Sequence, residues 1–170
     1  GKSDHAKKMR VRSAVADDGT ILGRYTEFWV DNGAYTHMGP AYISAVRQRT
    51  CNLYRVGAAG FDGKLVHTNK VSGGSYRGMG SPQIIWAIET QIDEIAERLG
   101  KDKLDYRIEI ANRPGDETPQ GWKIGTCALA ECLAEAGRRI GWAEKKDAMP
   151  PNRGIGFDSM INPSVGVLYA

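Results

Sequence analysis

A glycine-rich stretch, residues 72–82, combines the side chains and the backbone freedom best suited to chemistry. Glycine adopts positive φ easily and lets a bound group come close to the backbone. Arg77, in the middle of the stretch, can add a forked donor that stays charged. A helix start follows, where free N–H groups and a partial positive charge attract anions. We therefore predict an anion-binding loop whose glycines are Gly73, Gly74, Gly78 and Gly80.

The spacing of these glycines excludes two common nucleotide motifs. It does not fit the dinucleotide pattern GxGxxG, and the chain contains no GxxxxGK[ST] phosphate loop. A general phosphate- or nucleotide-binding module would therefore rest on the glycines alone. Glycine-rich turns between a strand and a helix also occur without any ligand. By itself, the loop leaves that structural alternative open.

The elements before the loop are predicted to be β-strands. Residues 9–16 alternate loosely between apolar and polar side chains, and residues 17–20 (Asp-Asp-Gly-Thr) are typical of a turn. Residues 21–30 then continue as a second strand, so the two segments are expected to form a hairpin. Two shorter strands are expected at residues 52–56 and 64–70, on either side of a loop at 57–63.

Three helices are predicted after the loop. Ser81 is a plausible N-cap, Pro82 suits the first helical position, and apolar residues recur at helical spacing up to Leu99, with Gly100 as the stop. Residues 103–112 and 127–140 are expected to be shorter helices, and residues 144–153 a connector. Residues 165–169 resemble a further strand. This order predicts an α+β fold with mixed β-strands and three helices.

Composition excludes several classes of function. The formal net charge is only +3 and no basic stripe is present, so nucleic acid is not an expected partner. No apolar run approaches the roughly 20 residues that span a bilayer, and the N-terminus lacks the apolar segment of a signal peptide. The three cysteines contain no CxxC pair, which disfavours disulfides or zinc and favours a reducing cytoplasm. The three histidines could form a metal triad, but we interpret them as ordinary surface or core residues.

The residues around the loop resemble the large subunit of the molybdenum hydroxylases, the xanthine dehydrogenase/aldehyde oxidase family. That family has an aromatic-Arg-Gly-x-Gly-x-Pro-Glu/Gln loop, which residues 76–83 match. Further similarity extends over nearly the whole chain, from residues 31–35 to residues 153–156. The similar positions after the loop are Glu89, Asp93, Ala96, Leu99, Gly100, Asp105, Arg107 and Asn112.

The resemblance implies part of a two-domain molybdopterin-binding subunit. Residues 1–113 would be the C-terminal part of the first molybdenum-cofactor-binding domain. Residues 114–170 would be a connector helix and the start of the second such domain. The family's general base, a glutamate, and its other cofactor loop lie outside this chain. We therefore expect a fragment that is inactive alone, with no catalytic or metal-ligating residue, whose partners are the remaining parts of the molybdenum subunit.

The resemblance also assigns roles within the loop. Arg77 matches the arginine that contacts the molybdopterin, and Tyr76, Gly78 and Gly80 would complete the cofactor contacts. Met79 occupies the place where several family members put an aromatic ring against the substrate, so it would line the substrate pocket; ordinary core packing is the alternative. Glu89 and Asp93, one helical turn apart, are interpreted as a structural pair.

Two departures from the family pattern reduce the number of possible substrate classes. Purine-oxidising members carry an arginine some thirty residues before the loop, where this chain has Ala45. In carbon monoxide dehydrogenases a copper-binding cysteine follows the loop arginine, and here that residue is Gly78. The remaining classes are aldehydes, N-heterocycles and aromatic acyl-CoA compounds, as in 4-hydroxybenzoyl-CoA reductase-like enzymes.

The implied enzyme is a molybdenum-dependent oxidoreductase of the cytoplasm with molybdenum–molybdopterin, in the cytosine dinucleotide form, as its cofactor. Electrons would leave through iron–sulfur clusters and FAD on other domains or subunits, because three scattered cysteines cannot ligate such clusters. The alternative to an enzyme is a non-catalytic binding or scaffold domain that shares the fold.

Overall fold

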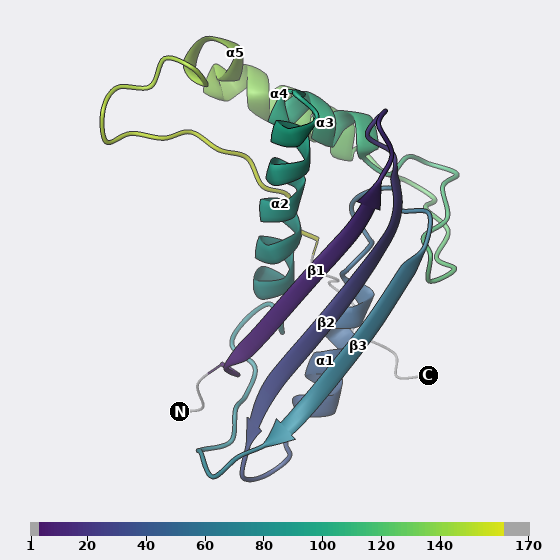
Figure 1. The fold of residues 1–170 in the computed structure, drawn as a ribbon, viewed down its shortest axis with the longest axis vertical. Helices are drawn as coiled ribbons and strands as arrows, with labels where there is room; N and C mark the ends of the chain where they lie inside the picture. The colour runs from purple at the N-terminus through teal and green to yellow at the C-terminus, as the bar shows by residue number, and fades with distance from the viewer. Residues whose placement is uncertain (1–3, 162–170) are drawn as a thin grey trace.

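The computed structural model describes residues 4–161. A hairpin, a crossover helix and a third strand come first, and four helices follow (Figure 1). In chain order the elements are β1 (Lys7–Val15), β2 (Ile21–Gly33), α1 (Gly39–Gln48), β3 (Ala59–His67), α2 (Ser81–Arg98), α3 (Lys103–Ile110), α4 (Leu129–Ile140) and α5 (Trp142–Lys145).

The three strands form one sheet in the order β1-β2-β3. β1 and β2 are antiparallel, which confirms the predicted hairpin. Their turn contains Gly19 at φ +99°, and the Thr20 N–H donates to Asp18 Oδ1 at 2.8 Å. β3 runs parallel to β2, and α1 lies in the connection between them. Parallel neighbours require such a crossover, since a tight turn can join only antiparallel strands.

Helices α1 and α2 cover one face of the sheet (Figure 1). Side chains along β2 alternate between the two faces, so Phe28 and Val30 are buried. They share one apolar cluster with Tyr42 and Val46 of α1 and with the isoleucines of α2. This core therefore joins the strands to the two helices that flank the glycine-rich loop.

The opposite face of the sheet has a basic and aromatic surface. Arg12 lies over the Tyr25 ring at 5.2 Å from its centroid, and Lys64 lies over Trp29 at 5.5 Å. Within residues 4–161 no helix packs on this face. Its side chains include Lys8, Arg10, Arg12, Tyr25, Glu27, Trp29, Asp62 and Lys64.

Helices α3, α4 and α5 form a second, smaller packing unit against the far end of α2. Asp102 caps α3, since its Oδ1 accepts the N–H groups of Leu104 and Asp105 at 2.8 and 3.1 Å. The indole Nε1 of Trp142 donates to the same carboxylate at 3.1 Å. Leu104, Leu133 and Trp142 make the apolar centre of this unit.

The strand predictions after the hairpin were wrong in part. Residues 59–63, expected in a loop, belong to β3, which ends at His67 rather than at residue 70. Gly60 and Gly63 suggested a loop, but neighbouring side chains occupy the space beside them. A Cβ on Gly60 would lie 2.6 Å from Tyr25 Cδ2. Residues 52–56 make only an isolated bridge, between Tyr54 and Ala111. The strand predicted at 165–169 lies outside the described residues.

The α+β class is confirmed, and the three predicted helices are present as α2, α3 and α4. The sequence does not predict α1, because its Gly39-Pro40 start resembles a break; proline is nevertheless compatible with the first turn of a helix. The short α5 is also additional. The N-cap of α2 is Gly80 rather than Ser81, and α4 begins at Leu129, two residues later than expected.

Candidate functional site

The first half of the glycine-rich loop is tied to the end of β2. Ser72 Oγ accepts the Tyr35 N–H at 3.0 Å, and the Gly73 N–H donates to the Asn32 carbonyl at 3.3 Å. Gly73 lies so close to the buried His5 ring that a Cβ at this position would overlap His5 Nδ1. These contacts fix the loop to the strand that precedes α1.

The second half of the loop is a left-handed turn directly before α2. Gly78, Met79 and Gly80 all have positive φ, at +91°, +43° and +83°. The Ser81 N–H closes the turn by donating to the Gly78 carbonyl at 2.9 Å. Positive φ is uncommon for a non-glycine residue, so Met79 holds a strained backbone. Such strain is concentrated at functional sites in proteins, and here it falls in the segment predicted to bind the cofactor.

The requirement for glycine at two positions comes from the protein's own packing. A Cβ on Gly80 would lie 2.5 Å from Val46 Cγ2, and a Cβ on Gly78 would lie 2.7 Å from Pro82 Cδ. The turn is therefore pressed onto α1 on one side and onto the start of α2 on the other. No ligand is needed to explain these glycines, and their approach to a metal centre stays a prediction.

Tyr76 and Arg77 form the exposed rim of the loop. The Tyr76 side chain is 73% exposed, and Arg77 is exposed as well. Among residues 4–161, the Arg77 guanidinium has no hydrogen-bond or ion-pair partner. The first turn of α2 has no side-chain cap. A free guanidinium therefore lies a few residues before the start of α2, where it could pair with a phosphate or another anion.

Met79 is half-buried and packs against the main apolar core. Part of the Met79 side chain is therefore packed in the core, as in the alternative to a substrate contact that the sequence leaves open. The rest of its surface is exposed. A substrate contact by Met79 remains a prediction.

A polar cluster not predicted from sequence lies under the loop. Gln83 Nε2 donates to Asp4 Oδ2 at 2.6 Å, and Lys7 pairs with the same carboxylate. The Lys7 ammonium also donates to the Tyr42 hydroxyl at 3.0 Å. Burial, together with the nearby Asp4, raises the pKa of Tyr42 well above its usual value. The four residues come from three separate segments, so the cluster has no local sequence signal, although Gln83 itself is part of the loop motif.

The histidines do not come together. His5 Nδ1 lies 2.8 Å from the Asp31 carbonyl, while His67 Nε2 lies 3.3 Å from Thr36 Oγ1. His37 is exposed on the loop after β2. In the part of the chain that the structure describes, no three His, Cys, Asp or Glu side chains are grouped to hold a metal.

Glu89 and Asp93 both bind Arg107, whose side chain is fully buried. Arg107 Nε donates to Glu89 Oε2 at 2.8 Å, and its Nη1 donates to Asp93 Oδ1 at 2.6 Å. Burial raises the pKa of the Glu89 carboxyl, and the guanidinium opposes that rise. The pair joins α2 to α3, so the structural interpretation of these carboxylates is confirmed.

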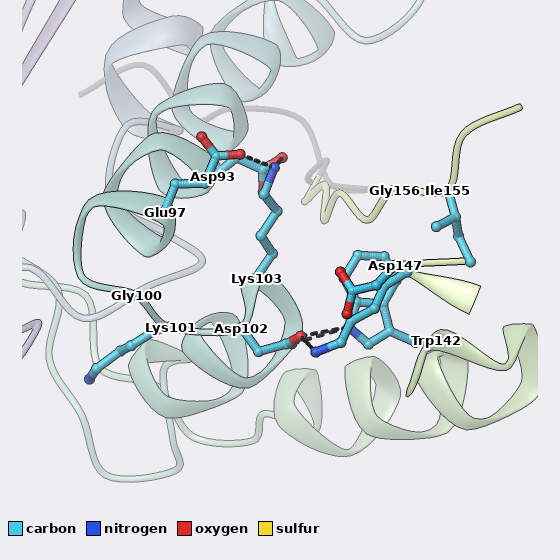
Figure 2. Close-up of a pocket in the computed structure, with 11 residues that line it drawn as sticks. Asp93, Glu97, Gly100, Lys101, Asp102, Lys103, Trp142, Asp147, Ile155 and Gly156 are labelled. Atoms are coloured by element: carbon cyan, nitrogen blue, oxygen red, sulfur yellow. Dashed lines mark hydrogen bonds and ion pairs between the residues drawn. The ribbon is translucent and has the colours of Figure 1, made fainter. Parts of the chain in front are cut away.

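A cleft of about 500 Å³ lies at the other end of α2, away from the loop (Figure 2). In Figure 2, Lys103 points toward Asp93 and Glu97, and Asp102 points toward Trp142. The charged groups that line the cleft are largely paired with one another; Lys103 Nζ, for example, lies 2.6 Å from Glu97 Oε1. No residue of the glycine-rich loop lines this cleft. We interpret it as the junction between α2, α3 and α5.

With this geometry established, comparison with known proteins identifies the family. Residues 1–110 match the model of the molybdopterin cofactor-binding domain. The match includes the sheet, both helices that pack on it and the entire loop. The chain therefore belongs to the molybdopterin cofactor-binding domain family, and the resemblance to molybdenum hydroxylase large subunits is confirmed.

Similar proteins support this family assignment. The chain is 35% identical over 162 residues to the xanthine dehydrogenase molybdenum-binding subunit of Escherichia coli, covering 91% of this chain and 21% of that protein. It is 31% identical over 154 residues to the aldehyde oxidoreductase of Megalodesulfovibrio gigas, covering 88% and 17%. The chain thus spans about a fifth of the length of these relatives.

Solved structures share the fold. The aldehyde oxidoreductase from Desulfovibrio gigas matches with a TM-score of 0.79 and 30% identity, over 88% of this chain and 16% of that one. Quinoline 2-oxidoreductase from Pseudomonas putida 86 matches with a TM-score of 0.69 and 25% identity, over 86% and 20%. No helix in residues 4–161 is long and apolar enough to cross a membrane.

Proposed function

We propose that this chain forms part of the molybdopterin-binding catalytic subunit of a molybdenum hydroxylase-type oxidoreductase. The family match over residues 1–110, which contains the whole glycine-rich loop, carries the proposal. We assign its substrate to the aldehydes, N-heterocycles or aromatic acyl-CoA compounds. Ala45 and Gly78, which replace a family arginine and a family cysteine, support the exclusion of purines and of carbon monoxide.

The cofactor contacts are assigned to Tyr76, Arg77, Gly78 and Gly80. Arg77 suits this role because its guanidinium is exposed and has no partner within residues 4–161. In the first turn of α2 the Ser81 N–H is already bound to the Gly78 carbonyl and Pro82 has no N–H, so the Arg77 guanidinium is the main donor that supports this assignment. A guanidinium fits an anionic pterin phosphate. The left-handed turn, packed against α1 and the start of α2, would hold the loop in place before binding.

Met79 is assigned to the wall of the substrate pocket. Its backbone lies between two glycines in a strained, positive-φ conformation, which sets the direction of the Cα–Cβ bond but leaves the thioether free to rotate. A flexible thioether at this position would tolerate substrates of different shapes better than an aromatic ring would.

When bound, the molybdenum cofactor, proposed in its cytosine dinucleotide form, supplies the redox chemistry. Electrons would leave to iron–sulfur clusters and FAD on other domains or subunits. Cys51 is buried and all three cysteines are free, which is consistent with clusters housed elsewhere. We assign no catalytic residue to this chain, so the chain alone is expected to be inactive.

The proposed domain boundary after residue 113 agrees with the end of the family match at residue 110. It also separates the main apolar core from most of the smaller cluster around Leu133 and Trp142. Residues 114–170 would then begin the second cofactor-binding domain, in an enzyme of the cytoplasm.

The test is Arg77→Ala in the intact enzyme that contains this chain, with molybdenum and pterin content measured after purification. We expect a clear fall in both, because the guanidinium would no longer hold the anionic cofactor. Arg98→Ala, an exposed arginine at the opposite end of α2, is the matched control and should leave the content unchanged. Unchanged molybdenum content in the Arg77 variant would count against the assigned role.

The same substitution should leave the fold intact. Since the exposed Arg77 side chain makes no hydrogen bond, ion pair or ring contact within the described residues, its loss should change the unfolding free energy by no more than about 0.5 kcal/mol. A large stability loss would mean that Arg77 is structural, and a change in molybdenum content could then no longer be assigned to cofactor binding.

A further inference from the structure

Asp4 contacts both ends of the glycine-rich loop. At the start of the loop, its backbone forms a parallel β-bridge with Gly74, so the residues before β1 lie beside the segment that leads into α2 (Figure 1). At the end of the loop, the Asp4 carboxylate accepts a hydrogen bond from Gln83 Nε2 at 2.6 Å. Tyr76 and Arg77 lie between these two attachment points. One residue therefore closes the base of the segment proposed to bind the cofactor.

The Asp4 carboxylate is itself held in place. Its Oδ1 accepts the His5 N–H at 2.9 Å, and Lys7 pairs with Oδ2. The Lys7 ammonium also donates to the Tyr42 hydroxyl of α1 at 3.0 Å. The Asp4 and Lys7 side chains are only 26% and 13% exposed. A carboxylate with an ion-pair partner and little contact with water has few other orientations, so it can direct Gln83.

His5 adds a second contact at the start of the loop. Its ring is buried, and it lies so close to Gly73 that any Cβ there would overlap it. His5 Nδ1 donates to the Asp31 carbonyl at 2.8 Å, since a carbonyl oxygen can only accept. The adjacent residues Asp4 and His5 therefore tie the loop to the end of β2 as well as to α2.

Gln83 depends on Asp4 for its orientation. Its Oε1 is buried and has no hydrogen-bond partner within residues 4–161, so the bond from Nε2 to Asp4 is the one that orients the amide. Gln83 belongs to the first turn of α2, three residues after Gly80. Because both ends of the loop are fixed, the residues between them have less conformational freedom to lose when a ligand binds.

We infer that Asp4 is a positioning residue for the cofactor loop: through Gln83 and Gly74 it holds Arg77 where the guanidinium meets the anionic cofactor. This role rests on the function proposed above for Arg77. Asp4 is assigned no contact with the cofactor and acts through the loop. Its loss should therefore change cofactor retention and the mobility of the loop together.

The test uses the intact enzyme that contains this chain and measures two quantities. One is the rate at which the purified enzyme loses molybdenum, and the other is amide hydrogen exchange in the peptide that spans residues 73–83. Asp4→Ala should accelerate molybdenum loss about tenfold, the effect expected from one hydrogen bond to a charged group, and should accelerate exchange in the loop. Glu97→Ala breaks another ion pair, with Lys103 at 2.6 Å, at the far end of α2 and should change neither quantity.

Two further variants test the contact between Asp4 and Gln83. Gln83→Glu places a second carboxylate against Asp4 and should also accelerate molybdenum loss. The exchange Asp4→Asn/Gln83→Glu restores one amide and one carboxylate, with Lys7 close by, and should bring retention back toward that of the wild type. Gln91→Glu is the matched control: the Gln91 amide also donates, to the Val11 carbonyl at 3.0 Å, but it lies farther along α2. Molybdenum retention should be unchanged in this control.

Combination with Arg77→Ala shows whether Asp4 acts through Arg77. If it does, Asp4→Ala should add little to the molybdenum loss of the Arg77 variant, whereas its cost in thermal stability should be the same in both backgrounds. A purely structural Asp4 would accelerate molybdenum loss equally with and without Arg77.

Unchanged molybdenum loss in Asp4→Ala, together with faster loss in Arg77→Ala, would overturn the positioning role and leave the proposed function standing. Equal effects of Asp4→Ala in the two backgrounds would also overturn it, as would a double exchange that fails to restore retention while the variants remain folded. Thermal unfolding identifies any variant that does not fold. Should Asp4→Ala be one, Gln83→Glu and the double exchange decide the outcome. Unchanged molybdenum content in Arg77→Ala would contradict the proposed role of Arg77, and the role of Asp4 would fall with it.

Discussion

Gly80 and Val46 are in direct contact, so that a Cβ on Gly80 would lie 2.5 Å from Val46 Cγ2. This contact presses the start of α2 onto α1. The loop that connects β3 to α2 is therefore held in place by a helix from an earlier part of the chain. The position of Arg77, three residues before Gly80, depends on this packing.

Gly80→Ala should destabilise the protein by about 2–4 kcal/mol, because it combines overpacking against Val46 with a left-handed backbone at φ +83°. Urea unfolding measures the change. Gly100→Ala is the matched control: Gly100 also has positive φ, at +65°, but nothing lies within 4 Å of its built Cβ. It should cost only the backbone strain, about 1 kcal/mol. Equal losses in the two variants would show that the Val46 contact contributes nothing.

Arg107→Met should be among the most damaging substitutions outside the loop. It leaves Glu89 buried without its partner, and breaking a buried pair in this way costs about 3–5 kcal/mol. Adding Glu89→Gln should recover part of the loss, since the uncompensated charge disappears. A double variant no more stable than Arg107→Met would argue against the charge as the cause.

The Arg107→Met variant should also respond to pH in a defined direction. Burial already raises the pKa of Glu89 above 4.5, and removing the guanidinium raises it further. A carboxyl whose pKa is higher in the folded state favours folding below its unfolded pKa, and this contribution is lost as pH rises through the folded pKa. The deficit relative to wild type should therefore narrow toward pH 4.5. Unfolding curves from pH 4 to pH 8 measure this, and a constant deficit would contradict it.

Asp102 should make the protein sensitive to acid. Burial tends to raise its pKa, but hydrogen bonds from Lys146, Trp142 and the amides of Asp105 and Leu104 outweigh burial and lower the pKa to about 2. The contribution is present above the unfolded value of 3.8 and is lost as pH falls from about 4 to about 2.

Asp102→Ala should remove that contribution together with the cap of α3, at a cost of about 1–2 kcal/mol at pH 7. Its unfolding free energy should then fall less steeply between pH 4 and pH 2 than that of the wild type. Asp102→Asn is the control that keeps a capping oxygen without the charge. If Asp102→Ala had the acid sensitivity of the wild type, Asp102 would not be the titrating group.

The sequence alone was sufficient where signals are local. Helix α2 was predicted from its proline start, its isoleucine spacing and its terminal glycine, and the hairpin from alternation around an Asp-Asp-Gly turn. The loop motif at residues 76–83 is the basis of the family resemblance. Its glycines and its arginine are close together in the chain, so the motif can be recognised from the sequence without the tertiary structure. In each case the deciding interactions lie within a few residues along the chain.

Tertiary structure alone decided the rest. The glycines of β3 resemble a loop in the sequence, but Tyr25 and Ile43 occupy the space beside them in the sheet. The packing of Met79 against the apolar core likewise depends on the tertiary structure. The cluster under the loop brings Asp4, Tyr42 and Gln83 together from distant segments. Such contacts depend on how strands and helices pack, which side-chain periodicity does not encode. The sequence therefore identifies the loop proposed to bind the cofactor, because its glycines and its arginine are adjacent in the chain, whereas the packing of α1 and α2 determines how that loop is held.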